Sequence, residues 1–200
     1  MPKLLFQQHG SFRLTADDGR VIYCDPYAGT DESYSLPADL ILITHGHKDH
    51  NQIDRCTQKP DCVVITNAEA LTNGKHNSFN IDGITIHAAV ASNEKHDPME
   101  CVGYILTVNN VKLYIAGDTS KTKQMERFAD LEIDYAFLPG DGVFNMDLRE
   151  AAECTRLIQA KHNIIYHLHP QDPFREKAEA WIAPNKLILE PGQEIEIYEQ

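Results

Sequence analysis

Short apolar or alternating segments recur along the chain, and Gly, Pro, Asn or Asp residues border most of them. Segments of this kind, rich in β-branched and aromatic residues, are typical of strands. We therefore predict strands at Leu4–Gln7, Arg20–Cys24, Leu40–Thr44, Cys62–Thr66, Ile84–Val90, Tyr104–Val108, Val111–Ala116, Tyr135–Leu138, Ile164–His167, Lys186–Leu189 and Ile195–Tyr198. Asn109 and Asn110 stand between two of these segments and predict a tight hairpin, because Asn tolerates the positive φ of such turns.

Helical patterns separate some of the predicted strands. They cover Ala68–Asn73, Lys121–Leu131, Leu148–Ala160 and Arg175–Ile182. In the third, Asp147 is placed to cap the helix and Glu150 to close a capping box. Its Ala151, Cys154 and Ile158 share one face and predict the buried side of that helix.

The order of strands and helices has no strict βαβ rhythm, which favours mixed sheets with helices outside them. We therefore predict an α/β fold. No linker-like segment or change of composition divides the chain, and two hundred residues suffice for one core. We expect a single domain over residues 1–200.

Composition narrows the possible partners. A formal charge of −12 without a basic run argues against nucleic acid, since binding to phosphates depends on clustered Lys and Arg. No apolar run approaches the roughly 20 residues of a membrane-spanning helix, and the N-terminal run is too short for a signal peptide. The five cysteines are scattered without a CxxC pair, which favours a reducing compartment over a disulfide framework or thiolate zinc site. We expect a cytoplasmic protein with a small-molecule substrate and no nucleic-acid or membrane partner.

The strongest chemical signal follows the apolar segment that ends at Ile43. It places His45, His47, Asp49 and His50 within six residues. Imidazole nitrogens and carboxylate oxygens are the ligands of Zn²⁺ in proteins, and a buried strand holds the residues after it rigidly. Gly46 is expected to give this bend its backbone freedom. The segment predicts a metal site.

This HxHxDH segment resembles the signature of the metallo-β-lactamase superfamily. Leu113–Thr119 resembles the second family motif, a strand that runs into Gly-Asp-Thr, and Ala160–His167 resembles a late strand that ends in a metal-binding histidine. Phe137–Gly142, with the helix after it, resembles the branch that contains ascorbate-6-phosphate lactonase and related small bacterial metal-dependent hydrolases. The resemblance covers nearly the whole chain.

The resemblance implies a four-layer αββα sandwich with the site at one edge between the sheets. It implies divalent ions, most simply zinc with manganese as the alternative, that activate a hydroxide for hydrolysis. Asp118 would bridge two ions, and Asp49 would bind the second and act as a base or proton relay. His47 stands where the diiron flavoprotein branch usually has Glu, which favours hydrolysis over redox chemistry. Asp25 is expected beneath the site as a partner of a ligating histidine or in a turn before Pro26, and His9 near the substrate or at the surface.

Two ligand positions stay open in the sequence. Most family members place a third histidine where this chain has Asn93, and His96 follows three residues later. Because an amide binds zinc much more weakly than imidazole, either His96 completes the first site or that site is weak, and one or two ions are possible. His167 and His169 compete for the last ligand position, with His167 favoured by its place at a strand end.

The expected activity is hydrolysis of a small ester, lactone or phosphorylated metabolite. A phosphodiesterase or nuclease is the alternative enzyme, and a metal-binding regulatory module without catalysis is the alternative outside enzymes. Metal stoichiometry separates them, since two tightly held ions favour the enzyme. The sequence sets no oligomeric state.

Overall fold

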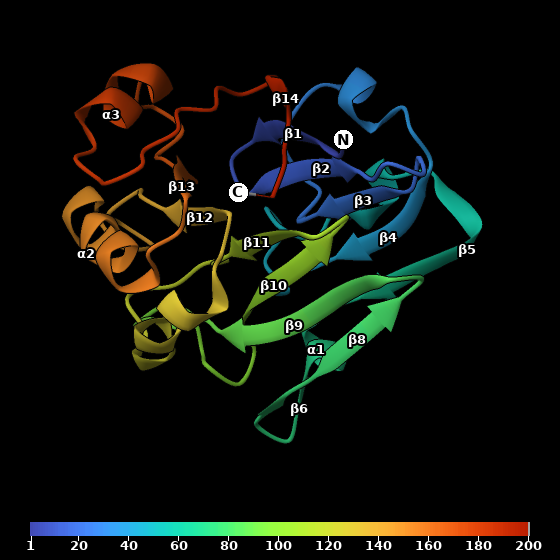
Figure 1. Ribbon diagram of the computed structural model, residues 1–200, viewed down its shortest axis with the longest axis horizontal. Coiled ribbons are helices and arrows are strands. Elements are labelled where there is room, and N and C mark those ends of the chain that lie inside the picture. Colours follow the sequence, from blue (N-terminus) through green and yellow to red (C-terminus); the bar gives the residue numbers. More distant parts are fainter. Residues whose placement is uncertain (200) are drawn as a thin grey trace.

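The computed structural model describes residues 1–199; Gln200, the last residue of the predicted domain, lies outside them. Two six-stranded sheets face each other (Figure 1). The first has the order β14-β1-β2-β3-β4-β5, with bounds Glu194–Glu196, Lys3–Gln8, Ser11–Thr15, Val21–Cys24, Ala38–Leu42 and Gln58–Ile65. The second has the order β13-β12-β11-β10-β9-β8, with bounds His162–Tyr166, Tyr135–Pro139, Val111–Ile115, Val102–Val108, Ile84–Val90 and Ser78–Ile81. A small hairpin, β6 (Leu71–Thr72) and β7 (Lys75–His76), lies apart from both.

Strand directions bring many loops to one edge. In the first sheet β3, β4 and β5 are parallel, and β1 runs the same way because β2 is antiparallel to both β1 and β3. In the second sheet β11, β12 and β13 are parallel, and β9 joins them by the same rule through β10. The carboxyl ends of strands within each set therefore meet at one edge of their sheet.

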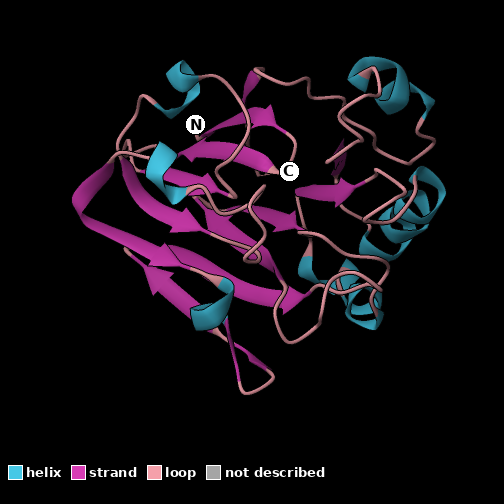
Figure 2. Cartoon of the chain, turned by 180° about the vertical axis from the view of Figure 1, so that it is seen from behind, coloured by secondary structure: helices cyan, strands magenta, loops and turns pink. Residues whose placement is uncertain are grey.

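Side chains alternate between two apolar environments along each strand. In β4, Leu40 and Leu42 enter the core between the sheets, whereas Ile41 packs on the outer face. The outer face of the second sheet is covered by α2 (Leu148–Ile158), α3 (Phe174–Ala180), and the 3₁₀ turns η3 (Lys123–Arg127) and η4 (Ala129–Leu131). These two helices lie together on one side of the molecule (Figures 1 and 2). The 3₁₀ turns η1 (Asp31–Tyr34) and η2 (Ile53–Arg55) cover the first sheet. The predicted α/β layers with mixed sheets are confirmed.

Several predicted elements differ from the structure. Ser11–Thr15 forms β2, which the prediction missed, and Lys121–Leu131 forms 3₁₀ turns in place of an α-helix. The segment predicted as a helix at Ala68–Asn73 holds only the short α1 (Asn67–Ala70), because Leu71 is extended and Asn73 has a φ of 52° in the β6–β7 turn. Lys186–Leu189 makes one isolated bridge, between Lys186 and Asn163, and is no strand.

The local signals around α2 and the Asn109–Asn110 turn mostly hold. Asp147 caps α2 by accepting from the Glu150 backbone N–H at 2.8 Å, and Ala151, Cys154 and Ile158 are fully buried. The predicted capping box is wrong, because Glu150 Oε1 accepts from the Lys121 backbone N–H instead. Asn109 and Asn110 form the predicted hairpin turn with φ values of 49° and 67°. Among residues 1–199, no helix has the length and apolarity to cross a membrane.

Candidate metal centre

The chemistry-bearing residues of the two sheets meet at the shared edge. His9 follows β1, Asp25 follows β3, and the His45–His50 segment follows β4. From the second sheet, Asn93 and His96 follow β9, Asp118 follows β11, Asp141 follows β12 and His167 follows β13. The backbone N–H of His167 donates to the carbonyl of His9 at 3.1 Å and so ties the two sheets together at the site.

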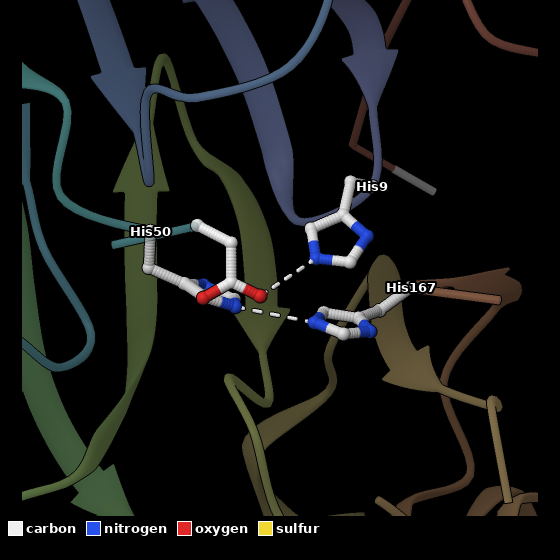
Figure 3. Close-up of side chains that lie close together, drawn as sticks. His9, His50 and His167 are labelled. Atoms are coloured by element: carbon white, nitrogen blue, oxygen red, sulfur yellow. Dashed lines mark hydrogen bonds and ion pairs between the residues drawn. The ribbon is translucent and has the colours of Figure 1, made fainter. Parts of the chain in front are cut away.

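The side chains form two clusters. His45, His47 and His96, here the first cluster, have nitrogens within 4.8 Å of one another. His9, Asp49, His50 and His167, here the second cluster, also have ligand atoms within 4.8 Å of one another. Figure 3 shows the imidazole rings of His9, His50 and His167 turned toward one another, with a dashed line between His50 and His167.

Asp118 lies between the clusters. Its Oδ2 is 3.2 Å from Nε2 of His96, and its Oδ1 is 3.3 Å from Nε2 of both His50 and His167. The carboxylate is buried. Gly117, just before it, has a φ of 67°, and a Cβ there would come within 2.8 Å of the Val102 carbonyl oxygen. One carboxylate thus presents one oxygen toward each cluster.

The carboxylate of Asp25 fixes the orientation of the His50 ring. Its Nδ1 lies 2.8 Å from Oδ2 of Asp25, and both side chains are completely buried. An ionised carboxylate only accepts, so Nδ1 of His50 carries the proton and Nε2 faces the site. Asp25 also accepts from the backbone N–H and hydroxyl of Thr44. Because that hydroxyl proton goes to Asp25, the Thr44 oxygen accepts from Nδ1 of His45, 3.0 Å away.

Asn93 supports His96 and lies outside the first cluster. Its Oδ1 accepts from Nδ1 of His96 at 2.9 Å and from the Lys95 backbone N–H at 2.8 Å. Nε2 of His96 is thereby left to face the cluster. The structure therefore brings His96 to the position beside His45 and His47 for which Asn93 was the other candidate.

His167 and His169 occupy different positions relative to the clusters. His167 is buried, and its Nδ1 lies 3.2 Å from Oδ2 of Asp141, an ion-pair distance that is not aligned as a hydrogen bond. Its Nε2 faces His50 and Asp118. His169 is half-buried, accepts from the Gln171 backbone N–H, and lines the neighbouring pocket.

The converging atoms fit a divalent metal. The Nε2 atoms of His50, His96 and His167 all lie 3.2–3.3 Å from the Asp118 carboxylate. Nε2 of His45 is buried without a hydrogen-bond partner among residues 1–199. Nitrogen and carboxylate oxygen atoms that converge this closely suit a cation, and imidazole with carboxylate is the ligand set of zinc. Outer partners that fix the ring orientation are typical of metal-binding histidines.

The electrostatics of the site point the same way. Burial lowers the pKa of His45 to about 3, so this imidazole is neutral and able to bind metal. Burial also acts to lower the pKa of His50, but the carboxylates of Asp118 and Asp25 outweigh it and raise that pKa to about 9. Burial would raise the pKa of Asp118, yet the surrounding histidines hold it well below its usual range. The buried carboxylates therefore favour a positive charge in the centre.

Two glycines near the histidines differ in the space around them. A Cβ on Gly10 would lie 2.8 Å from Cε1 of His50, so the ring packs where only glycine leaves room. A Cβ on Gly46 would meet nothing within 4 Å, and Gly46 has no positive φ. The expectation that Gly46 is needed for the bend is wrong. Left-handed backbone occurs instead at His9, Asp25 and His167, with φ values of 56°, 45° and 49°.

A pocket of about 520 Å³ opens over both clusters. Cluster residues form its floor, and its walls come from Lys95, Phe144, Leu168, Pro170 and Gln171. Sequence reasoning assigned no role to these wall residues, nor to Thr44, Asn145 and Asp141. For Asp141 a signal existed, since it lies in the Pro-Gly-Asp-Gly segment after a predicted strand.

Comparisons with known proteins agree with this geometry. The family model of the beta-lactamase superfamily domain matches residues 3–167. A UPF0173 metal-dependent hydrolase from Thermococcus kodakarensis is 30% identical over 98% of this chain and 100% of its own. The crystal structure of a metal-dependent hydrolase from Parabacteroides distasonis has 30% identity and a TM-score of 0.72, over 92% of this chain and 90% of that one. A Zn-dependent hydrolase of the superfamily from Thermotoga maritima, at 20% identity and TM-score 0.64 over 86% and 78% of the chains, shares the fold. The chain therefore belongs to the metallo-β-lactamase superfamily and, within it, to the UPF0173 family of metal-dependent hydrolases.

Proposed function

We propose that this metal-dependent hydrolase acts on a small ester, lactone or phosphorylated metabolite. The pocket over the clusters carries the proposal, because cavities of ~300–1,000 Å³ take small-molecule ligands and this one measures about 520 Å³. Phe144, Leu168 and Pro170 give it apolar walls. Lys95 is the one Lys or Arg side chain of residues 1–199 that lines it, which suits a substrate with a single anionic group.

In this proposal the first cluster holds one ion through His45, His47 and His96. Asp49, His50 and His167 would hold a second ion, and Asp118, which lies between the two clusters, would serve both. Zinc is the proposed metal, because nitrogen-rich sites suit it and the Thermotoga maritima relative is named as Zn-dependent; manganese is the alternative. Bound ions would lower the pKa of water and polarise the oxygen of the scissile group.

Asp49 is the residue proposed to handle the proton. Its Oδ2 lies 3.2 Å from Nε2 of His9, and that hydrogen bond holds the pKa of Asp49 well below its usual range against the opposing effect of burial. A carboxylate with so low a pKa stays ionised, so it accepts a proton from water only transiently and passes it on. His9 lies at the pocket and donates this hydrogen bond from Nε2, so it positions the Asp49 carboxylate and takes no proton at that atom.

The resemblance of Phe137–Gly142 to the ascorbate-6-phosphate lactonase branch supports a lactone as the first substrate to test. A phosphodiesterase or nuclease is less favoured, because one lysine cannot grip a nucleic-acid backbone and the chain carries a charge of −12. A regulatory module is less favoured because the imidazole of His96, and not the weaker amide ligand of Asn93, lies beside His45 and His47. The five free cysteines support a cytoplasmic location.

The test is an activity screen of zinc- and manganese-loaded protein across lactones, esters, thioesters, amides and phosphodiesters. We expect turnover of an anionic lactone or ester that disappears after chelation and returns with metal. Lys95→Ala should raise KM for anionic substrates while leaving kcat for a neutral ester unchanged. Turnover of phosphodiesters with none of lactones or esters would reject the proposal.

A further inference from the structure

The amide of Asn145 contacts both side chains that support the outer nitrogens of His96 and His167. Asn145 is buried in the loop between β12 and α2. Its Nδ2 donates to Oδ2 of Asp141 at 2.8 Å, and its Oδ1 accepts from Nδ2 of Asn93 at 3.4 Å. Its backbone N–H also donates to Asp141 at 3.1 Å. One side chain therefore links the supports of the two clusters.

The side-chain amides of Asn145 and Asn93 are each oriented by a neighbouring group that can only accept a hydrogen bond. The Asp141 carboxylate requires the NH₂ of Asn145, which turns the Asn145 oxygen toward Asn93. The Phe144 carbonyl requires the NH₂ of Asn93, at 2.9 Å, and this turns the Asn93 oxygen toward His96. Reversal of either amide would set donor against donor or acceptor against acceptor.

We propose that Asn145 is a positioning residue for both metal sites, acting on His96 through Asn93 and on His167 through Asp141. The inference rests on the two-ion assignment made under the proposed function. Outer partners of metal ligands typically change affinity by ~10–100-fold. Asn145 is one contact further out, and Phe144 and the loop backbone also hold its two neighbours. Its loss should cost roughly 10-fold at each site, at the low end of that range.

The experiment titrates metal-free protein with Co²⁺ and follows its visible absorption, which reports ligand geometry at each ion independently of turnover. Asn145→Ala should weaken both binding steps. Asn93→Ala should weaken the step of the first cluster, and Asp141→Asn that of the second. The control is Asn77→Ala, which removes two amide hydrogen bonds, to the Glu69 carbonyl and the Thr72 hydroxyl, outside both clusters. It should lower stability but leave both Co²⁺ affinities unchanged.

A double variant distinguishes positioning from a general loss of stability. If Asn145 acts through Asn93, then Asn93→Ala with Asn145→Ala should bind the first ion no more weakly than Asn93→Ala alone. The inference is overturned if Asn145→Ala lowers Tm while both affinities stay unchanged, or if only one step weakens. Uptake of fewer than two ions by the parent protein would reject the metal assignment and this inference with it. Two intact binding steps without any hydrolysis would reject only the proposed function.

Discussion

Oδ2 of Asp25 lies 2.8 Å from Nδ1 of His50 in a contact that is completely closed to solvent. Asp25 has a left-handed backbone, with a φ of 45°, and the same carboxylate holds the backbone and hydroxyl of Thr44. One buried side chain thus orients the second cluster directly and, through Thr44, the His45 ring of the first.

Asp25→Asn should weaken the second metal site about 10–100-fold. The amide cannot accept from Thr44 and His50 at the same atoms, so one buried donor loses its partner. That loss should also lower the free energy of unfolding by about 1–3 kcal/mol. Metal titration and chemical denaturation measure the two effects. The control is Asp39→Asn, because Asp39 also accepts a backbone N–H and pairs with Lys59 but lies outside the clusters. Unchanged affinity in Asp25→Asn would contradict the expectation.

Asp118→Ala should reduce affinity at both metal positions and abolish hydrolysis. Its two oxygens face different clusters, so no other single residue replaces it. Elemental analysis after dialysis, with a rate assay, checks both effects. His169→Ala is the comparison, because His169 lines the pocket without facing Asp118 and should keep both ions. Loss of one ion with near-normal turnover would show that Asp118 serves a single site.

Gly10→Ala should disturb the His50 ring and weaken the second ion selectively. The added methyl would lie 2.8 Å from the ring, and overpacking of this kind typically costs about 1–3 kcal/mol of stability. Gly46→Ala adds the same methyl beside His45, where nothing lies within 4 Å, and should be neutral. Thermal unfolding and metal titration of the two variants test the contrast. Equal behaviour of the pair would refute it.

Metal uptake should release a proton from His50 at neutral pH. The carboxylates of Asp118 and Asp25 raise its pKa to about 9 against burial, so the metal-free protein is protonated there at pH 7. Since a metal needs the neutral imidazole, affinity at the second site should rise with pH toward 9. In the metal-free protein, folding stability depends on pH in the opposite direction. The stability that the raised pKa of His50 contributes is complete below about pH 6.5 and is lost as the pH rises through 9. Calorimetric zinc titrations in two buffers should show more protons released at pH 7 than above pH 9. Equal release at both would disprove the assignment.

The sequence by itself determined the strand-rich α/β fold and named most of the side chains that meet in the two clusters. Alternating apolar positions fixed most of the strands locally, and His45–His50 are neighbours in the chain, so their convergence needs no long-range information. The hairpin at Asn109–Asn110 and the Asp147 cap are equally local, since each depends on the conformational preference of one or two residues.

Tertiary structure alone decided which side chains support those histidines. Asn93 and Asn145 are 52 positions apart, and Asp141 meets His167 because β12 and β13 pair in one register. No local pattern encodes such a register, which depends on packing of both sheet faces. The same applies to His96, which follows β9 in the second sheet and meets His45 and His47, which follow β4 in the first, only because the two sheets pack together. Residue type alone determines which side chains can bind a metal, whereas the orientation of each imidazole ring is set by partners that meet only in the folded chain.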